Sequence, residues 1–122
     1  SGVTVVQALG NSMGASGAVL ACHLFPDISR TFAFVPQANP YADRRWMKYT
    51  SEIETIRWQN FAALPCANMP SLFFGDTGPD ELHVNLFREA GHDVRIFENC
   101  GHKLAEQLKE RGEYEALLNE FW

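Results

Sequence analysis

The stretch that decides the fold is residues 3–24, which read VTVVQALGNSMGASGAVLACHL. An apolar, largely β-branched run at 3–9 meets the pentapeptide GNSMG at 10–14 and continues into a segment rich in glycine and alanine. This order predicts a buried strand, a sharp turn and a helix that lies close to a sheet. A serine at such a turn is held in a strained backbone conformation, so Ser12 is the candidate nucleophile.

The pentapeptide has the form G-x-S-x-G, in which the chain on either side of the serine is pressed together. We therefore predict that both Gly10 and Gly14 must lack a Cβ. The first N–H groups of the following helix would point toward negative charge that develops beside the Ser12 hydroxyl. The string alone is a weak signal, and the alternative interpretation is an ordinary Gly/Ser turn in a strand–helix unit.

Composition limits the classes of protein to which the chain can belong. With 122 residues, 46% of them hydrophobic and 20% charged, it fits a single globular domain. A formal charge of −5, without a basic stripe, argues against nucleic acid or an anionic membrane as a partner. The sequence shows neither an apolar run long enough to span a bilayer nor a signal peptide, so we expect a cytoplasmic location.

The three cysteines, Cys22, Cys66 and Cys100, are widely spaced and form no C-x-x-C pair. This pattern argues against both a disulfide framework and a zinc site. We expect reduced thiols, no bound metal and no organic cofactor.

Further apolar runs predict the remaining elements. Strands are expected at 31–35, 71–74 and 94–97, and helices at 79–90, 103–111 and 113–121. The alternation of strands and helices predicts an α/β fold, in which a mostly parallel sheet forms the middle layer of an αβα sandwich covering 1–122. The strand at 94–97 is expected nearer an edge than the others.

Residues 37–69 are richer in charged and aromatic residues, and we interpret them as a lid-like excursion that contains a helix. One interpretation is a lid or pocket wall over Ser12, because loops at the carboxyl ends of parallel strands form the ligand crevice. The other is a crossover helix packed on the sheet. Arg44 and Arg45 could bind an anion, but a solvated helix start is favoured.

Residues with complementary chemistry follow three of the predicted strands. Ser12 follows the first, Asp76 or Asp80 the third, and His102 the fourth. The carboxyl ends of parallel strands lie at one edge of a sheet, so we expect these residues to meet. A serine hydroxyl needs an imidazole to take its proton, and the imidazole needs a carboxylate to fix its tautomer.

The choice between the two aspartates stays open, with a preference for Asp76. Asp76 stands directly at the end of a strand, whereas Asp80 lies among the first residues of a helix, where a carboxylate also caps. The other histidines of this region, His83 and His92, are expected to be solvated.

In the order nucleophile, acid, histidine, the sequence resembles the α/β-hydrolases, of which it covers only the second half. The resemblance implies that Ser12 is the nucleophile, that His102 is the general base and acid, and that Met13 donates one N–H to an oxyanion hole. The family's earlier strands, and the loop that supplies a second oxyanion donor, have no counterpart in the sequence. The chain is therefore expected to be a weak enzyme by itself or a piece of a longer protein.

The expected function is a serine hydrolase that cleaves an ester, thioester or amide of a small-molecule acyl substrate through an acyl-enzyme. The alternative is a non-catalytic α/β-hydrolase-like binding or assembly module, which a His102 ring far from Ser12 would favour. A flavodoxin-like or Rossmann-type nucleotide binder is disfavoured, because GNSMG is neither a G-x-G-x-x-G nor a P-loop.

The strand at 3–9 is nearly continuously apolar, which is typical of a strand covered on both faces and paired on both edges. Only the strand at 31–35 is expected beside it. We therefore expect a second copy of the chain, in a homo-oligomer, or a partner segment to complete the sheet at the Val3 edge.

Overall fold

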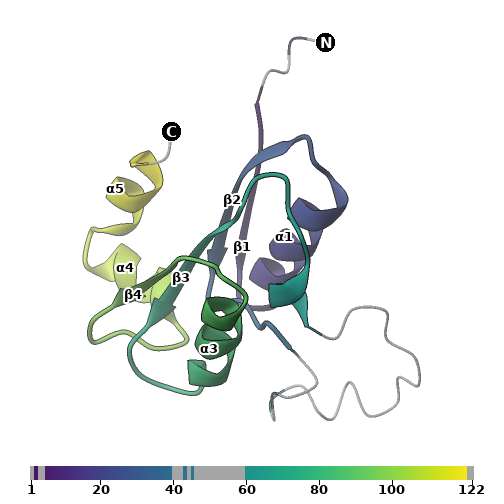
Figure 1. Ribbon diagram of the computed structural model, residues 1–122. Coiled ribbons are helices and arrows are strands. Elements are labelled where there is room, and N and C mark those ends of the chain that lie inside the picture. Colours follow the sequence, from purple (N-terminus) through teal and green to yellow (C-terminus); the bar gives the residue numbers. More distant parts are fainter. Residues whose placement is uncertain (1, 3–4, 40–42, 44, 46–59, 121–122) are drawn as a thin grey trace.

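The computed structural model describes residues 2, 5–39, 43, 45 and 60–120 (Figure 1). The strands are β1 (Val6–Asn11), β2 (Ile28–Phe34), β3 (Ser71–Gly75) and β4 (Val94–Phe97). The helices are α1 (Met13–Leu24), α3 (Glu81–Glu89), α4 (Leu104–Glu110) and α5 (Tyr114–Asn119), with a 3₁₀ turn, η2, at Phe61–Ala63. Within these described ranges, no helix has the length and apolar character needed to cross a membrane.

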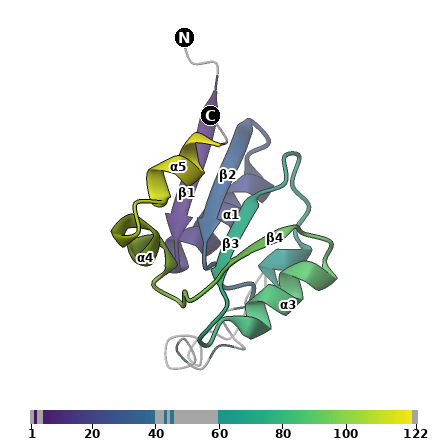
Figure 2. The ribbon, with the colours of Figure 1, turned by 90° about the vertical axis from the view of Figure 1, so that its left-hand side faces the viewer.

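The strands form a parallel sheet in the order β1-β2-β3-β4. Helices α1 and α3 lie on one side of it, and α4 and α5 lie on the other (Figures 1 and 2). The predicted α/β class and three-layer arrangement are thus confirmed. The strand at 94–97 lies at one edge of the described sheet, as predicted, but β1 lies at the other. Because all four strands run the same way, the turns that follow them gather at one edge of the sheet.

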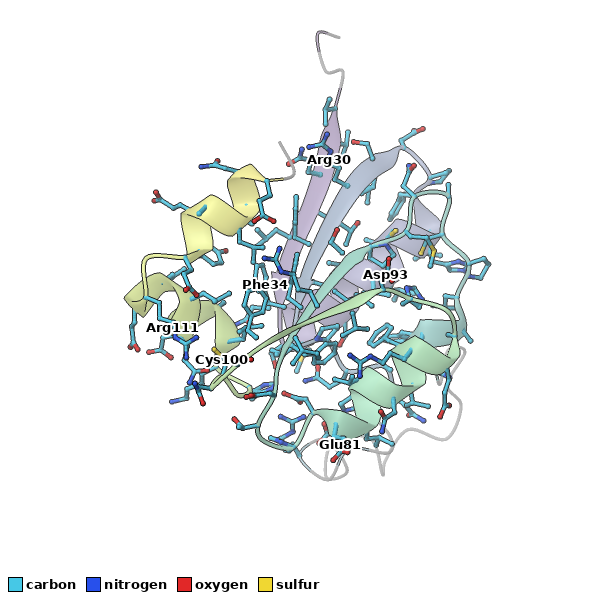
Figure 3. The ribbon with its side chains drawn as sticks, turned by 60° about the vertical axis from the view of Figure 1, so that its left-hand side comes forward. Arg30, Phe34, Glu81, Asp93, Cys100 and Arg111 are labelled. Carbon is cyan, nitrogen blue, oxygen red and sulfur yellow. The ribbon has the colours of Figure 1, made fainter. Side chains whose placement is uncertain are left out.

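Alternating side chains on β2 and β3 supply the two halves of the core. Phe34 stacks on Phe73, with ring centroids 4.9 Å apart, and points toward α4 and α5, where it meets Tyr114 (Figure 3). Phe74 points to the opposite face and meets Phe87 of α3, with centroids 6.2 Å apart. These aromatic contacts join the helices of both outer layers to the sheet.

The excursion predicted at 37–69 is described only in part. The prediction places a helix within 37–69, and residues 46–59 of this stretch lie outside the described residues. At its end, η2 carries the chain back toward β3, and Asn60 caps this turn by accepting a hydrogen bond from the N–H of Ala62.

Strand β1 is an edge strand. It pairs with β2, and the described residues provide no strand on its other side. Its large apolar side chains are exposed, with exposed fractions of 42% for Val6 and 52% for Leu9, and Val5, just before the strand, is 56% exposed. The full burial that the sequence predicts for this strand is therefore absent from the described part of the chain.

The two glycines that flank Ser12 differ in what surrounds them. A Cβ on Gly10 would overlap the backbone carbonyl of Gly14, so the close approach expected at Gly10 is confirmed. A Cβ on Gly14 would meet nothing within 4 Å. The prediction that Gly14 must be glycine is wrong, because only the strand side of the turn is crowded.

This difference gives a test within one motif. We expect Gly10→Ala to lower the free energy of unfolding by about 1–3 kcal/mol or more, because the strand and helix must move apart. The control, Gly14→Ala, should leave stability unchanged or raise it by up to about 1 kcal/mol, since alanine restricts the unfolded chain. Urea denaturation of both variants measures the difference, and equal losses would contradict it.

Candidate active site

Ser12 occupies the turn between β1 and α1 in an unusual conformation. Its φ is 56° and its ψ is −116°, a region that residues other than glycine seldom adopt. Its N–H donates to the carbonyl of Phe34 on β2 at 2.8 Å, and its own carbonyl accepts from the N–H of Ser16 at 3.1 Å. These bonds fix the turn at the carboxyl edge of the sheet.

A chain of hydrogen bonds starts at the Ser12 hydroxyl. Ser12 Oγ lies 2.8 Å from Nε2 of His102, and Nδ1 of the same ring lies 2.8 Å from Oδ2 of Asp80. An ionised carboxylate can only accept, so Nδ1 carries the proton and Nε2 accepts from the serine hydroxyl. The Asp80 side chain is only 4% exposed and that of His102 is 30% exposed, so the ring is reached from solvent while the acid is shielded.

Of the two candidate acids, Asp80 is the one that contacts the imidazole. Asp76 is exposed at the end of β3, where its N–H donates to the carbonyl of Phe97 at 3.1 Å. Asp80 stands at the N-cap position of α3, but its side chain makes no capping hydrogen bond. The geometry therefore pairs His102 with Asp80 and not with the preferred Asp76, and it contradicts the capping interpretation of Asp80.

The loop after β4 is fixed in place just before the histidine. The Cys100 carbonyl accepts from the N–H of Thr77 at 3.0 Å and from its Oγ1 at 2.8 Å. A Cβ on Gly75 would overlap this carbonyl, so the loop can approach β3 only because residue 75 is glycine. The Gly101 N–H donates to Oε1 of Gln107 at 2.9 Å, which joins the loop to α4.

Gln37, to which the sequence assigns no role, lies against Ser12 in the structure. Its Nε2 donates to Ser12 Oγ at 3.3 Å. Ser16 fixes the orientation of the amide, because its Oγ lies 3.0 Å from Gln37 Oε1 and accepts from the Gln37 N–H at 2.8 Å. Val35, just before this turn, has a φ of 49°, a strained value for a β-branched residue. The signal in the sequence is the position of Gln37, two residues after the end of a predicted buried strand.

A second set of polar side chains leads away from Asp80. Arg45 Nη2 donates to Asp80 Oδ1 at 2.7 Å, and its Nε donates to both oxygens of Asp43, at 2.9 and 3.1 Å. His83 accepts from the N–H of Ala38 at Nδ1, 3.0 Å away, so its Nε2 donates to Asp43 Oδ2 at 2.8 Å. The expectations of a solvated His83 and a solvated Arg45 are wrong, because both side chains pair with buried carboxylates.

Two other side chains with reactive groups, His92 and Cys66, make none of the hydrogen bonds described above. His92, expected to be solvated, is buried and donates from Nε2 to the carbonyl of Ala62 at 3.0 Å. Burial and the adjacent Cys22 raise the pKa of the Cys66 thiol to about 12, which leaves it a poor nucleophile. Among the described residues, no group of three or more His, Cys, Asp or Glu side chains could hold a metal ion.

The charged groups beside His102 stay ionised at neutral pH. Burial acts to raise the pKa of Asp80, but hydrogen bonds from His102 and Arg45 outweigh it and hold that pKa below its usual value. Burial likewise opposes ionisation of Asp43, while hydrogen bonds from Arg45 and His83 bring its pKa well below the usual range. The bond to Asp43 raises the pKa of Arg45, so the guanidinium is always charged.

The fold has a counterpart among solved structures. The chain is similar to the acylaminoacyl peptidase of Pyrococcus horikoshii in its orthorhombic crystal form, with a TM-score of 0.65 over 96% of this chain. The fold is α/β-hydrolase-like. Sequence identity is 13%, and the chain spans 23% of the peptidase chain, so the likeness concerns the fold of one part of that protein. No protein-family model matches the sequence, and no curated protein does.

The lowered pKa of Asp80 predicts how stability depends on pH. The pKa of Asp80 is lower in the folded chain than in the unfolded chain, where it is about 3.9. At pH values between these two pKa values, the unfolded chain binds more protons. The ionised Asp80 therefore makes its full contribution to the free energy of unfolding at neutral pH, and this contribution is lost as the pH falls below about 4. In urea denaturation from pH 6 to pH 3, we expect the stability of the wild type to fall more steeply than that of Asp80→Asn. Parallel curves would contradict this prediction.

Proposed function

We propose that this chain is a serine hydrolase, with Ser12 as nucleophile, His102 as general base and acid, and Asp80 as the acid that orients the histidine. The observation that carries the proposal is the pair of 2.8 Å contacts that joins the three side chains in the order these roles require. The α/β-hydrolase-like fold supports the proposal, because this fold carries a serine at the same strand–helix turn.

In the proposed reaction, Ser12 Oγ attacks the carbonyl carbon of an ester, thioester or amide and passes its proton to His102 Nε2. The Nδ1–H bond to Asp80 keeps Nε2 free to accept that proton and stabilises the imidazolium that forms. His102 then returns the proton to the leaving group. Water, activated in turn by the same ring, hydrolyses the acyl-enzyme and restores the serine.

The helix that follows Ser12 suits the charge that develops during attack. Met13 is the first residue of α1, so its N–H has no acceptor within the helix, and the helix dipole favours negative charge there. We assign this N–H to the oxyanion. Gln37 Nε2 donates to Ser12 Oγ and is assigned to holding the hydroxyl in line with His102. The roles in the proposed reaction need no metal or organic cofactor.

A second candidate function is a binding or assembly module of the same fold. The exposed apolar edge of β1 favours it, because such an edge accepts another strand. The contact between His102 and Ser12 favours the hydrolase instead, since a module has no need of a base beside a serine. The two functions are compatible if a further strand on β1 completes an active sheet.

Labelling with a fluorophosphonate tests the proposed hydrolase directly. The probe phosphonylates only an activated serine, so we expect covalent labelling of the wild type and none of Ser12→Ala. Asp80→Asn should label about four orders of magnitude more slowly, because the imidazole is then held in the wrong tautomer.

Asp76→Asn is the matched control, because it removes an exposed carboxylate from the same loop. It should label at the rate of the wild type. If the wild type labels no faster than Ser12→Ala, in the presence of any partner that completes the sheet, the proposed hydrolase is excluded.

The open edge of β1 predicts association through that strand. We expect the chain to form dimers or to capture an added strand there, and Val5→Lys to weaken this association, since a lysine on an edge strand opposes pairing. Sedimentation velocity over a range of concentrations measures the effect. A wild-type chain that stays monomeric at the highest concentration and pairs with no other segment would refute the prediction.

A further inference from the structure

We infer that Arg45 is a positioning residue for the proposed active site, where it holds the Asp80 carboxylate in the orientation that His102 needs. Asp43 and His83 in turn hold Arg45. The kinetic part of this inference rests on the proposed hydrolase function, whereas its structural part concerns the hydrogen bonds alone.

The two oxygens of Asp80 are bound on different sides. Oδ1 accepts from Arg45 Nη2 at 2.7 Å, while Oδ2 accepts from His102 Nδ1 at 2.8 Å. Rotation of the carboxylate would break one of these bonds in a buried place, where an unpaired charged oxygen is costly. Arg45 therefore restricts Asp80 to the orientation in which Oδ2 faces the imidazole.

The guanidinium is itself held from one side. Both oxygens of Asp43 accept from Arg45 Nε, and Asp43 Oδ1 also accepts from the Arg45 backbone N–H at 2.9 Å. His83 fixes Asp43 from α3 through its Nε2. Asp80 and His83 are three residues apart at the start of α3, so one face of this helix binds both Arg45 and Asp43.

The charges of this cluster explain why an arginine beside Asp80 leaves the acid effective. Arg45 on its own would cancel the negative charge that Asp80 presents to the imidazolium. Asp43 compensates for the guanidinium, so the three side chains carry a net negative charge of one. Arg45 can thus orient the acid while the His102 ring still faces a negative group.

A purely structural role is the competing explanation, in which the cluster only attaches Asp43 and Arg45 to α3. The two explanations differ in what happens to the rate and pH dependence of Ser12 labelling when the fold is retained. Arg95 provides a matched control, because it pairs with Glu120 at the surface, 2.7 Å away.

The experiment compares fluorophosphonate labelling of the wild type with that of Arg45→Ala, Arg45→Lys and Arg95→Ala. We expect Arg45→Ala to label about ten- to a hundredfold more slowly, in keeping with the loss of one charge-assisted hydrogen bond. Arg45→Lys should recover part of the rate. Added methylguanidinium should raise the rate of Arg45→Ala and leave that of Arg95→Ala unchanged.

The pH dependence of the labelling rate distinguishes a positioning role from a purely structural one. The ionisable groups around His102 in this cluster are Asp43 and Arg45 after β2, and Asp80 and His83 on α3. Removing the positive charge in Arg45→Ala favours the imidazolium, so the acidic limb of the labelling rate should move to higher pH. Asp43→Asn removes a negative charge and should move that limb to lower pH.

If Arg45→Ala labels at the wild-type rate and the acidic limb of its pH profile does not move, the inference is overturned. If Arg45→Ala does not fold, two other measurements decide between the explanations. These are the shift of the acidic limb to lower pH in Asp43→Asn and the partly reduced labelling rate of Arg45→Lys. If the wild type itself is not labelled, the hydrolase proposal fails separately, and the proton resonance of His102 Nδ1–H still tests the positioning. An unchanged resonance in Arg45→Lys and Asp43→Asn would then refute it, and a shifted or lost resonance would support it.

Discussion

The Ser12 backbone, with a φ of 56° and its N–H bound to the Phe34 carbonyl, turns the chain from β1 into α1 within a single residue. Such a conformation costs of the order of 1–3 kcal/mol and persists only where the surroundings enforce it. Here the carbonyl of Gly14 lies against Gly10, and the helix packs on the sheet through the buried Ala15. If this turn relaxed, the hydroxyl would leave the edge at which all the other functional groups arrive.

The residues that follow each strand place a different part of the site at that edge. β1 leads to Ser12, β2 to Gln37 and the 43–45 segment, β3 to Asp80, and β4 to His102. A parallel sheet makes this possible, since every strand ends on the same side. The roles also separate by burial, because the acid is shielded from water while the imidazole is reached from solvent.

The strands and the strand–helix turn at Ser12 could be predicted from the sequence, because they depend on short-range patterns of apolar residues and glycine. The identity of the acid did not follow from such patterns. Asp80 at a helix start has the local signature of a cap, and only a contact with His102, 22 residues away, reveals its other use. The contacts of His83 with Asp43 and of Arg45 with Asp80 are missed for the same reason, since these partners lie 40 and 35 residues away in the sequence.

Ser12 and His102, the base in the proposed reaction, are 90 residues apart in the sequence. During synthesis Ser12 emerges first, and it has no group to take its proton until β3, β4 and the loop that carries His102 have joined the sheet. An incomplete or partly unfolded chain therefore holds an ordinary, unreactive alcohol. If Ser12 acts as the proposed nucleophile, its reactivity therefore depends on the folded sheet and not on the strand–helix turn alone.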